Sequence, residues 1–137
     1  MSCRDIRELQ EPVWDAAARA IAECEAAGLH VLVTCTYRSP EEQSALYAQG
    51  RTAPGHIVTN AKAGQSMHQW RVALDIVPLV NGKPDWDGSH PVWHQIAAVF
   101  KKHGFEWGYD WPRMKEMPHF QMTGGHPLSY FQQGGKL

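Results

Sequence analysis

The stretch from Ser66 to Asp75 reads SMHQWRVALD, and its second half runs on in apolar residues as far as Pro78. This pattern predicts a short strand from Val72 to Val77. Asp75 interrupts the apolar strand. Burying a carboxylate is costly unless it pairs with a cation, accepts hydrogen bonds or binds a metal. The strand therefore carries a candidate functional group.

His68 lies seven residues before Asp75. The two would be about 23 Å apart on a straight strand and about 10.5 Å apart on one helix, too far to share an ion. We therefore expect the chain to bend over Gln69, Trp70 and Arg71 if the two side chains are to meet. Taken alone, the pair has two interpretations: a solvated or capping histidine beside a salt-bridged aspartate, or two ligands of one metal ion.

Length and charge narrow the classes of function. The chain has 137 residues and a net charge of -1, enough for one domain with its own core but without the basic field of a nucleic-acid-binding protein. The charged N-terminus lacks the apolar run of a signal peptide, and no window is apolar enough for a membrane span. We expect a single domain over 1–137, made in the cytoplasm and acting as a monomer without nucleic acid or direct membrane insertion.

The other potential metal ligands show no strong spacing. Cys3, Cys24 and Cys35 form no CxxC pair, so we interpret them as reduced thiols, two of them buried. His90 and His94 have helical spacing but lack the glutamate of HExxH, so we interpret them as a capping and a surface residue. Eight histidines and six tryptophans are nevertheless many for this length.

Further elements surround the central strand. A capping box at Ser39 and Glu42 opens a helix and places Arg38 at a strand-to-helix junction. Pro118 suits a sheet margin, and the tail after Gly124 shows no element. The remaining predictions are helices over 12–27, 40–49 and 91–102, strands over 30–36, 105–111 and 117–122, and a long loop over 51–65 with a brief strand over 56–59. Together they predict a small α+β domain with an antiparallel sheet and helices packed mainly on one side.

A third metal ligand must come from elsewhere in the chain. A catalytic zinc typically takes three protein ligands and leaves the fourth position for water. His119 stands out because Glu116 lies three positions before it, in EMPH. A free carboxylate beside the water is the base that hydrolysis requires. The alternative for Glu116 is a surface glutamate beside Lys115.

These motifs resemble the zinc peptidases of the D-alanyl-D-alanine carboxypeptidase type, and within them the phage endolysins that act as L-alanyl-D-glutamate endopeptidases. The family pattern is SxHxxGxAxD followed far downstream by (D/E)xxH. The segments TYRSPEEQ and FEWGYDW are similar to the family's YRSxxEQ and WGxDW regions. The resemblance covers roughly residues 10–122, and the residues that match the two ligand motifs are Ser66, His68, Ala73, Asp75, Glu116 and His119.

The resemblance implies roles by position. His68, Asp75 and His119 would bind zinc and Glu116 would be the general base. Arg38 would steady the substrate carbonyl or the developing oxyanion. The positions that would support the ligands, line the cleft or bind substrate are Tyr37, Gln43, Ser66, Trp107, Asp110 and Trp111, with plain core packing as the alternative for the aromatic ones.

One residue departs from the family pattern. Arg71 stands where the family has glycine, so either the turn has another shape or it tolerates a side chain. We also consider that Arg71 reaches a carboxylate of a substrate peptide.

The resemblance implies a peptidoglycan hydrolase in which zinc-activated water attacks an amide of the stem peptide, with L-Ala-D-Glu as the expected bond. The chain would be a compact phage or prophage lysin, bacteriolytic once a membrane-permeabilising partner releases it from the cytoplasm to the cell wall. The alternatives are a D-Ala-D-Ala carboxypeptidase or dipeptidase, and a non-catalytic zinc-bearing module that binds wall peptides. Glu116 and Arg38 argue against the last, because binding alone needs no general base.

Overall fold

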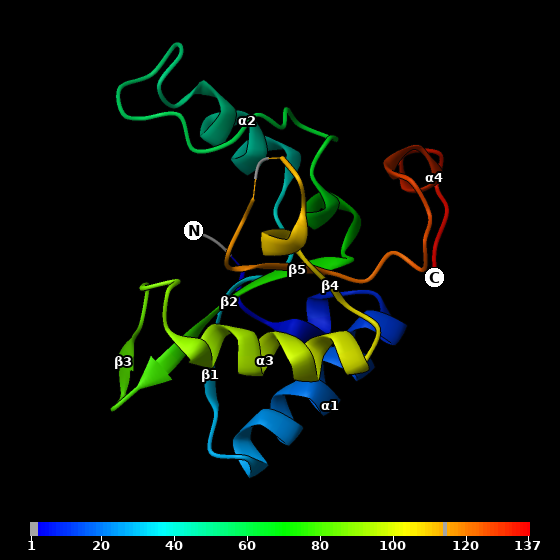
Figure 1. Cartoon of the computed structure of the whole chain (residues 1–137). Coiled ribbons are helices and arrows are strands. Elements are labelled where there is room, and N and C mark those ends of the chain that lie inside the picture. The colour runs from blue at the N-terminus through cyan, green and yellow to red at the C-terminus, as the bar shows by residue number, and fades with distance from the viewer. Residues whose placement is uncertain (1–2, 114) are drawn as a thin grey trace.

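An antiparallel sheet lies at the centre of the computed structural model, which describes residues 3–113 and 115–137. Its strand order is β1-β2-β5-β4, and β3 pairs with the far end of β2 (Figure 1). The strands are β1 (His30–Cys35), β2 (Ala73–Val80), β3 (Lys83–Pro84), β4 (Glu106–Trp107) and β5 (His119–Gln121).

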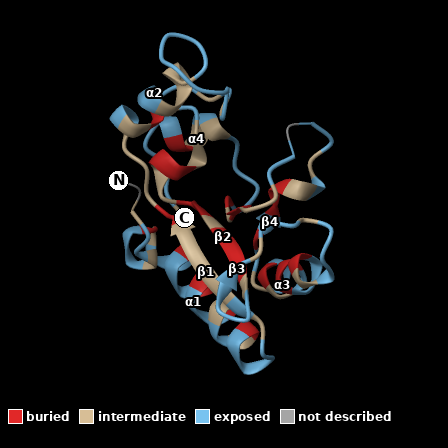
Figure 2. Cartoon of the chain, turned by 90° about the vertical axis from the view of Figure 1, so that its left-hand side faces the viewer, coloured by how far each residue is buried: buried red, intermediate tan, exposed pale blue. Residues whose placement is uncertain are grey.

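Two helices cover one face of this sheet (Figure 1). They are α1 (Glu11–Ala26) and α3 (Pro91–Lys102), which lie side by side. Apolar residues at helical spacing form the buried stripe of each helix. The buried residues are the red parts of the ribbon in Figure 2. The Phe100 ring packs 4.9 Å from the Phe120 ring of β5, which ties α3 to the sheet. The hydrophobic core therefore lies between these helices and one sheet face.

The other side of the sheet carries α2 (Pro40–Ala48), the long loop and the 3-10 turn η2 (Met67–Trp70) (Figure 1). The predicted capping box starts α2: the Glu42 amide donates to Ser39 Oγ over 3.1 Å, and the Ser39 amide donates to Glu42 Oε1 over 3.2 Å. The strand predicted over 56–59 is wrong. Side-chain hydrogen bonds hold that segment instead, with Arg51 donating to the Thr59 carbonyl.

Four further predictions need correction. The strand predicted over 105–111 is reduced to β4, and a 3-10 turn follows it. Strand β2 continues through Pro78, because proline keeps extended backbone and its carbonyl still accepts from the Asp85 amide. Strand β5 lies inside the sheet rather than at its margin, since Pro118 stands just before it. The tail does form a short helix, α4 (Leu128–Gln132), which buries Phe131.

The predicted α+β class with an antiparallel sheet is confirmed. Two more 3-10 turns, η1 (Ile6–Glu8) and η3 (Gly108–Asp110), complete the described elements. The three cysteines are free thiols, as predicted, with Cys24 and Cys35 buried. Within the described residues, no helix combines the length and the hydropathy needed to cross a membrane.

Candidate metal centre

Three neighbouring strands bring Cys35, Asp75 and His119 side by side. Asp75 pairs with Cys35 across β1 and with His119 across β5. Directly opposed residues in an antiparallel sheet share a face. Leu74 and Ile76 alternate with Asp75 and are fully buried in the core. Asp75 therefore projects from the sheet face opposite the helical core.

A tight turn returns His68 to the start of the same strand. Ser66 caps η2, its hydroxyl accepting from the His68 amide over 3.3 Å. Arg71 then adopts a left-handed conformation with φ 63° and ψ 33°. As a result His68 Nε2 lies 3.2 Å from Asp75 Oδ1. The bend expected between the two residues is present.

His119 approaches the same carboxylate oxygen from the other side. Its Nδ1 lies 3.4 Å from Asp75 Oδ1, and its ring meets the His68 ring edge-on with centroids 5.1 Å apart. One nitrogen of each imidazole therefore lies within 3.4 Å of the same carboxylate oxygen.

Hydrogen bonds fix which nitrogen each neutral histidine presents. His68 donates from Nδ1 to the Thr36 carbonyl over 2.8 Å, and His119 donates from Nε2 to Gln121 Oε1 over 2.8 Å. Glu106 Oε1 in turn accepts from the Gln121 amide. The remaining nitrogens, Nε2 of His68 and Nδ1 of His119, carry free lone pairs that face Asp75. No sequence motif points to Gln121, because its role depends on strand pairing.

Cys35 offers an alternative third donor. Among the described residues, Cys35, His68 and Asp75 place one ligand atom each within 4.8 Å of one another. The Cys35 sulfur, however, lies 3.7 Å from His68 Nδ1, the nitrogen already bonded to the Thr36 carbonyl. It is also buried behind the cleft, whereas His119 lines it. The geometry favours the set that includes His119.

The contacts that His68 and Asp75 make shift the pKa values of both groups more than their burial does. Burial lowers the pKa of His68, but the facing Asp75 carboxylate and the Cys35 contact raise that pKa well above its ordinary range. Burial raises the pKa of Asp75, but the two histidines hold it well below its ordinary value. Without metal the site is therefore an ion pair, and a metal must displace a proton to bind the histidine.

Arg38 stands beside this carboxylate. One guanidinium nitrogen donates to Gln43 Oε1 over 2.9 Å, and another lies 3.7 Å from Asp75 Oδ2 and 3.6 Å from the Cys35 sulfur. The buried Gln43 side chain also donates to the Ala61 carbonyl over 2.7 Å, which ties α2 to the long loop. Within the described residues, Arg38 Nε has no partner. The guanidinium is thus fixed at the cleft with donor capacity to spare.

Glu116 lies close to the proposed metal ligands. Its Oε2 lies 3.8 Å from His119 Nδ1, and the side chain is about half exposed. The preceding glycine bend sets this position: the Glu116 amide donates to the Gly108 carbonyl, and a Cβ on Gly108 would lie 2.6 Å from the Glu116 carbonyl oxygen. The glycine of FEWGYDW therefore permits a close backbone approach.

A cleft of about 640 Å³ is lined by Arg38, His68, Asp75, Glu116 and His119. Ser66 and Trp111 also line it, and the Trp111 ring lies 5.3 Å from the His119 ring. The other predicted cleft residues lie elsewhere. Trp107 is buried in the core with its indole donating to the Met117 carbonyl, and Asp110 pairs with Lys101 on the surface.

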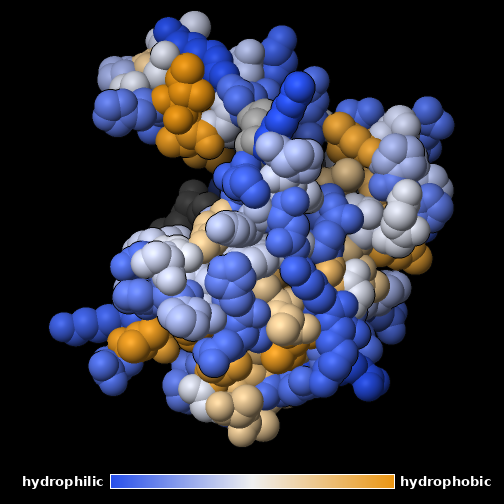
Figure 3. Space-filling view, in the orientation of Figure 1, coloured by the Kyte–Doolittle hydropathy of each residue, from blue (hydrophilic) through white to orange (hydrophobic). Residues whose placement is uncertain are grey.

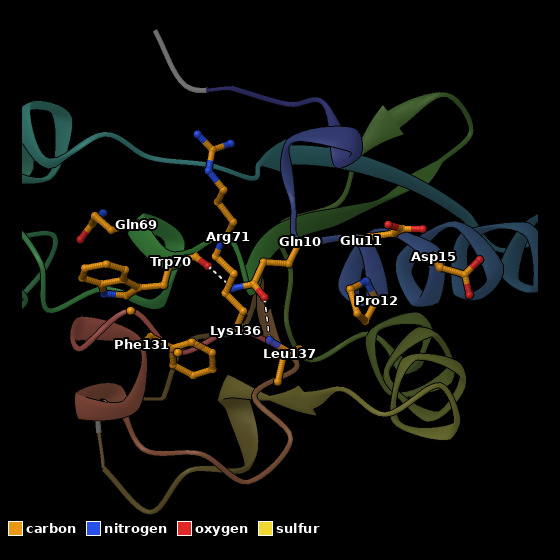
Figure 4. Close-up of a pocket in the computed structure, with 12 residues that line it drawn as sticks. Gln10, Glu11, Pro12, Asp15, Gln69, Trp70, Arg71, Phe131, Lys136 and Leu137 are labelled. Atoms are coloured by element: carbon orange, nitrogen blue, oxygen red, sulfur yellow. Dashed lines mark hydrogen bonds between the residues drawn. The ribbon is translucent and has the colours of Figure 1, made fainter.

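Arg71 also points away from the cleft. Its guanidinium donates to Glu8 Oε2 over 2.9 Å and stacks 3.9 Å over the Tyr37 ring. It borders a separate cavity of about 820 Å³ beside the C-terminal tail, drawn in Figure 4. That cavity is larger than the cleft but contains none of the three proposed ligands. In this structure Arg71 has Glu8 as its carboxylate partner, which replaces the substrate carboxylate considered from the sequence.

Comparison with known proteins matches the part of the chain that holds the proposed ligands and base. The sequence model of the D-alanyl-D-alanine carboxypeptidase family matches residues 59–122, the span that holds His68, Asp75, Glu116 and His119. This match confirms the resemblance. Residues 10–58, which contain α1, β1 and α2 together with Arg38 and Gln43, lie outside the matched span.

Individual relatives extend the resemblance. A peptidoglycan L-alanyl-D-glutamate endopeptidase of Bacillus subtilis is 39% identical over 103 residues, covering 69% of this chain and 62% of the relative. An L-alanyl-D-glutamate peptidase of Listeria phage A118 is 28% identical over 138 residues, covering 97% of this chain and 45% of the relative. The chain thus spans less than two thirds of either relative. The crystal structure of a Serratia marcescens L-Ala D-Glu endopeptidase shares the fold, with a TM-score of 0.66 at 20% identity over 90% of this chain and 89% of the other.

Proposed function

We propose that the chain is a zinc peptidase that hydrolyses the stem peptide of peptidoglycan at the L-Ala-D-Glu bond. The observation that carries the proposal is the convergence of His68 Nε2 and His119 Nδ1 on Asp75 Oδ1, with Glu116 Oε2 3.8 Å from His119. Two imidazoles and one carboxylate form a donor set that suits catalytic zinc and leaves a position for water. The named relatives support the substrate and the bond.

When bound, zinc supplies a Lewis acid that polarises the scissile carbonyl and lowers the pKa of water. The protein's own groups do the rest. Arg38 donates to the carbonyl oxygen, where negative charge develops as water attacks. Glu116 accepts a proton from the attacking water and passes it to the leaving amine as the amide bond breaks. Gln43 holds the Arg38 guanidinium for this role.

The matched family description favours a second candidate, a D-Ala-D-Ala carboxypeptidase or dipeptidase. The cleft chemistry is the same, and only the bond differs. A non-catalytic wall-peptide-binding module is less well supported, because binding alone requires neither Glu116 nor Arg38 beside the proposed metal ligands.

The proposed setting is the bacterial cell wall, reached as a phage-type lysin after synthesis in the cytoplasm; the phage relative supports this setting. We propose further that residues 1–137 act as one catalytic domain and as a monomer without membrane insertion.

Digestion of defined muropeptides tests the proposal. The protein is assayed as prepared, after chelation and after zinc restoration, and mass spectrometry identifies the new termini. We expect activity to fall with chelation and return with zinc, with L-Ala carboxyl ends among the products. D-Ala release would instead select the carboxypeptidase. Glu116→Gln should keep zinc but lose about 100-fold or more in kcat; full activity in that variant would overturn the mechanism.

A further inference from the structure

A second hollow continues the cleft beyond Glu116. It has a volume of about 520 Å³. The two hollows share six lining residues, which are Val58, Thr59, Ala61, Trp111, Lys115 and Glu116. They therefore form one elongated depression. We call its outer part the side groove; its residues are Ile57, Val58, Thr59, Asn60, Ala61, Trp111, Arg113, Lys115 and Glu116.

One wall of the side groove is apolar. Ile57 and Val58 are 57% and 53% exposed, although neither is needed by the hydrophobic core. Figure 3 shows hydrophobic surface on the part of the molecule formed by α2 and the long loop, facing a hollow in the body. Exposed apolar side chains that gather beside a catalytic cleft are typical of a binding surface.

The loop that carries this wall is held in place. The Arg51 guanidinium donates to the Thr59 carbonyl over 3.0 Å and to Asn60 Oδ1 over 2.8 Å, and it stacks 3.9 Å over Tyr47. Gly50 has φ +80°, and a Cβ there would lie 2.6 Å from the Ile57 amide nitrogen. The apolar wall is thus presented on a fixed backbone.

The facing wall carries two cations, Arg113 and Lys115, beside the Glu116 carboxylate. Lys115 is held by the Tyr109 carbonyl, to which its ammonium donates over 2.9 Å. Arg113 is exposed, and no carboxylate of the described residues pairs with its guanidinium. An unpaired guanidinium at a groove wall is suited to bind a carboxylate through two parallel hydrogen bonds.

An acidic, extended peptide matches both walls. A glutamyl residue in a peptide carries two carboxyl groups and uses only one in the next amide, so one carboxylate stays free. We propose that the side groove binds the acidic segment of the substrate next to the scissile bond, with Arg113 pairing that free carboxylate and Ile57 and Val58 covering the apolar side. This inference rests on the proposed function and adds a residue that sets substrate preference.

Two matched substrates test it: a muropeptide with the free D-glutamyl carboxylate, and the same peptide with that carboxylate amidated. We expect the parent to prefer the acid by about fivefold in KM, the range of an exposed ion pair. Arg113→Ala should abolish the preference and Arg113→Glu should reverse it, with kcat changed less than about twofold because Arg113 does not touch the reacting atoms. Arg19→Ala, which removes an exposed arginine on α1 paired only with Asp15, is the matched control and should keep the parent's preference.

Failure of this inference is distinct from failure of the proposed function. If the parent cleaves both peptides and Arg113→Ala keeps the preference for the acid, the side groove is not the carboxylate site. If the parent cleaves neither, the proposed function fails, and calorimetric binding of both peptides to zinc-loaded Glu116→Gln protein still decides the inference. Equal Kd values for the acid and the amide would overturn it, whereas tighter binding of the acid that Arg113→Ala removes would support it.

Discussion

The Arg71 guanidinium lies 2.9 Å from Glu8 Oε2, so the residue that departs from the family's glycine is bound to the N-terminal segment rather than to the cleft. Its backbone nevertheless keeps the left-handed geometry that glycine adopts most easily. The turn between His68 and Asp75 therefore has the shape a glycine would give it, and the contacts with Glu8 and Tyr37 offset the strain of a side chain there.

Arg71→Gly should consequently leave activity on cell walls within about twofold of the parent. Glycine relieves about 1–2 kcal/mol of left-handed backbone strain, while loss of the half-exposed ion pair costs up to about 1 kcal/mol. The melting temperature and the rate of wall lysis measure the two effects. A large loss of lysis with unchanged stability would show that Arg71 does contact substrate.

Substitution of His119 and substitution of Cys35 should affect zinc binding differently. His119→Ala should weaken zinc binding by more than about 100-fold, beyond the effect of losing a partner outside the ligand set. Cys35→Ala should bind one zinc with little change, because its sulfur faces the bonded side of His68. Zinc content after dialysis measures both, and the cobalt-substituted parent should show no thiolate-to-metal absorption. Zinc loss in Cys35→Ala alone would instead assign the cysteine as the ligand.

Gln43 should matter to both stability and rate. Gln43→Leu leaves the Arg38 guanidinium and the Ala61 carbonyl without their buried partner. We expect a loss of about 1–3 kcal/mol in the free energy of unfolding and a lower kcat at unchanged zinc content. Gln95→Leu, an exposed substitution on α3, is the control for changing glutamine to leucine. Unchanged kcat in Gln43→Leu would remove Gln43 from the support of Arg38.

The metal-free protein should show a pH dependence set by the central ion pair. Folding raises the pKa of His68 above its unfolded value of about 6.5 and lowers that of Asp75 below about 3.9. The histidine contribution is complete below about pH 6.5 and is lost as pH rises through the raised pKa; the aspartate contribution is present above about pH 4 and is lost as pH falls. Stability from this pair should thus be greatest between about pH 4 and 6.5.

Melting temperatures of chelator-treated protein across this range test the expectation. Asp75→Asn removes the charge and should flatten the profile. Profiles of the same shape for the parent and Asp75→Asn would mean that the pair contributes nothing to the pH dependence.

The sequence determined much of this molecule because its signals are local. Ser39 and Glu42 fix the start of α2, and the apolar run through Leu74 and Ile76 specifies a strand. The motif residues at 68, 75, 116 and 119 identified the candidate ligands and base before any geometry was known.

The tertiary structure decided what depends on strand register and on contacts between distant segments. Only the pairing of β1, β2 and β5 shows that Cys35 lies beside Asp75 and that Gln121 orients His119. Only packing shows that Trp107 belongs to the core and that Arg71 turns to Glu8. A one-residue change of register would turn Asp75 to the opposite face, and no local pattern in the sequence encodes that choice.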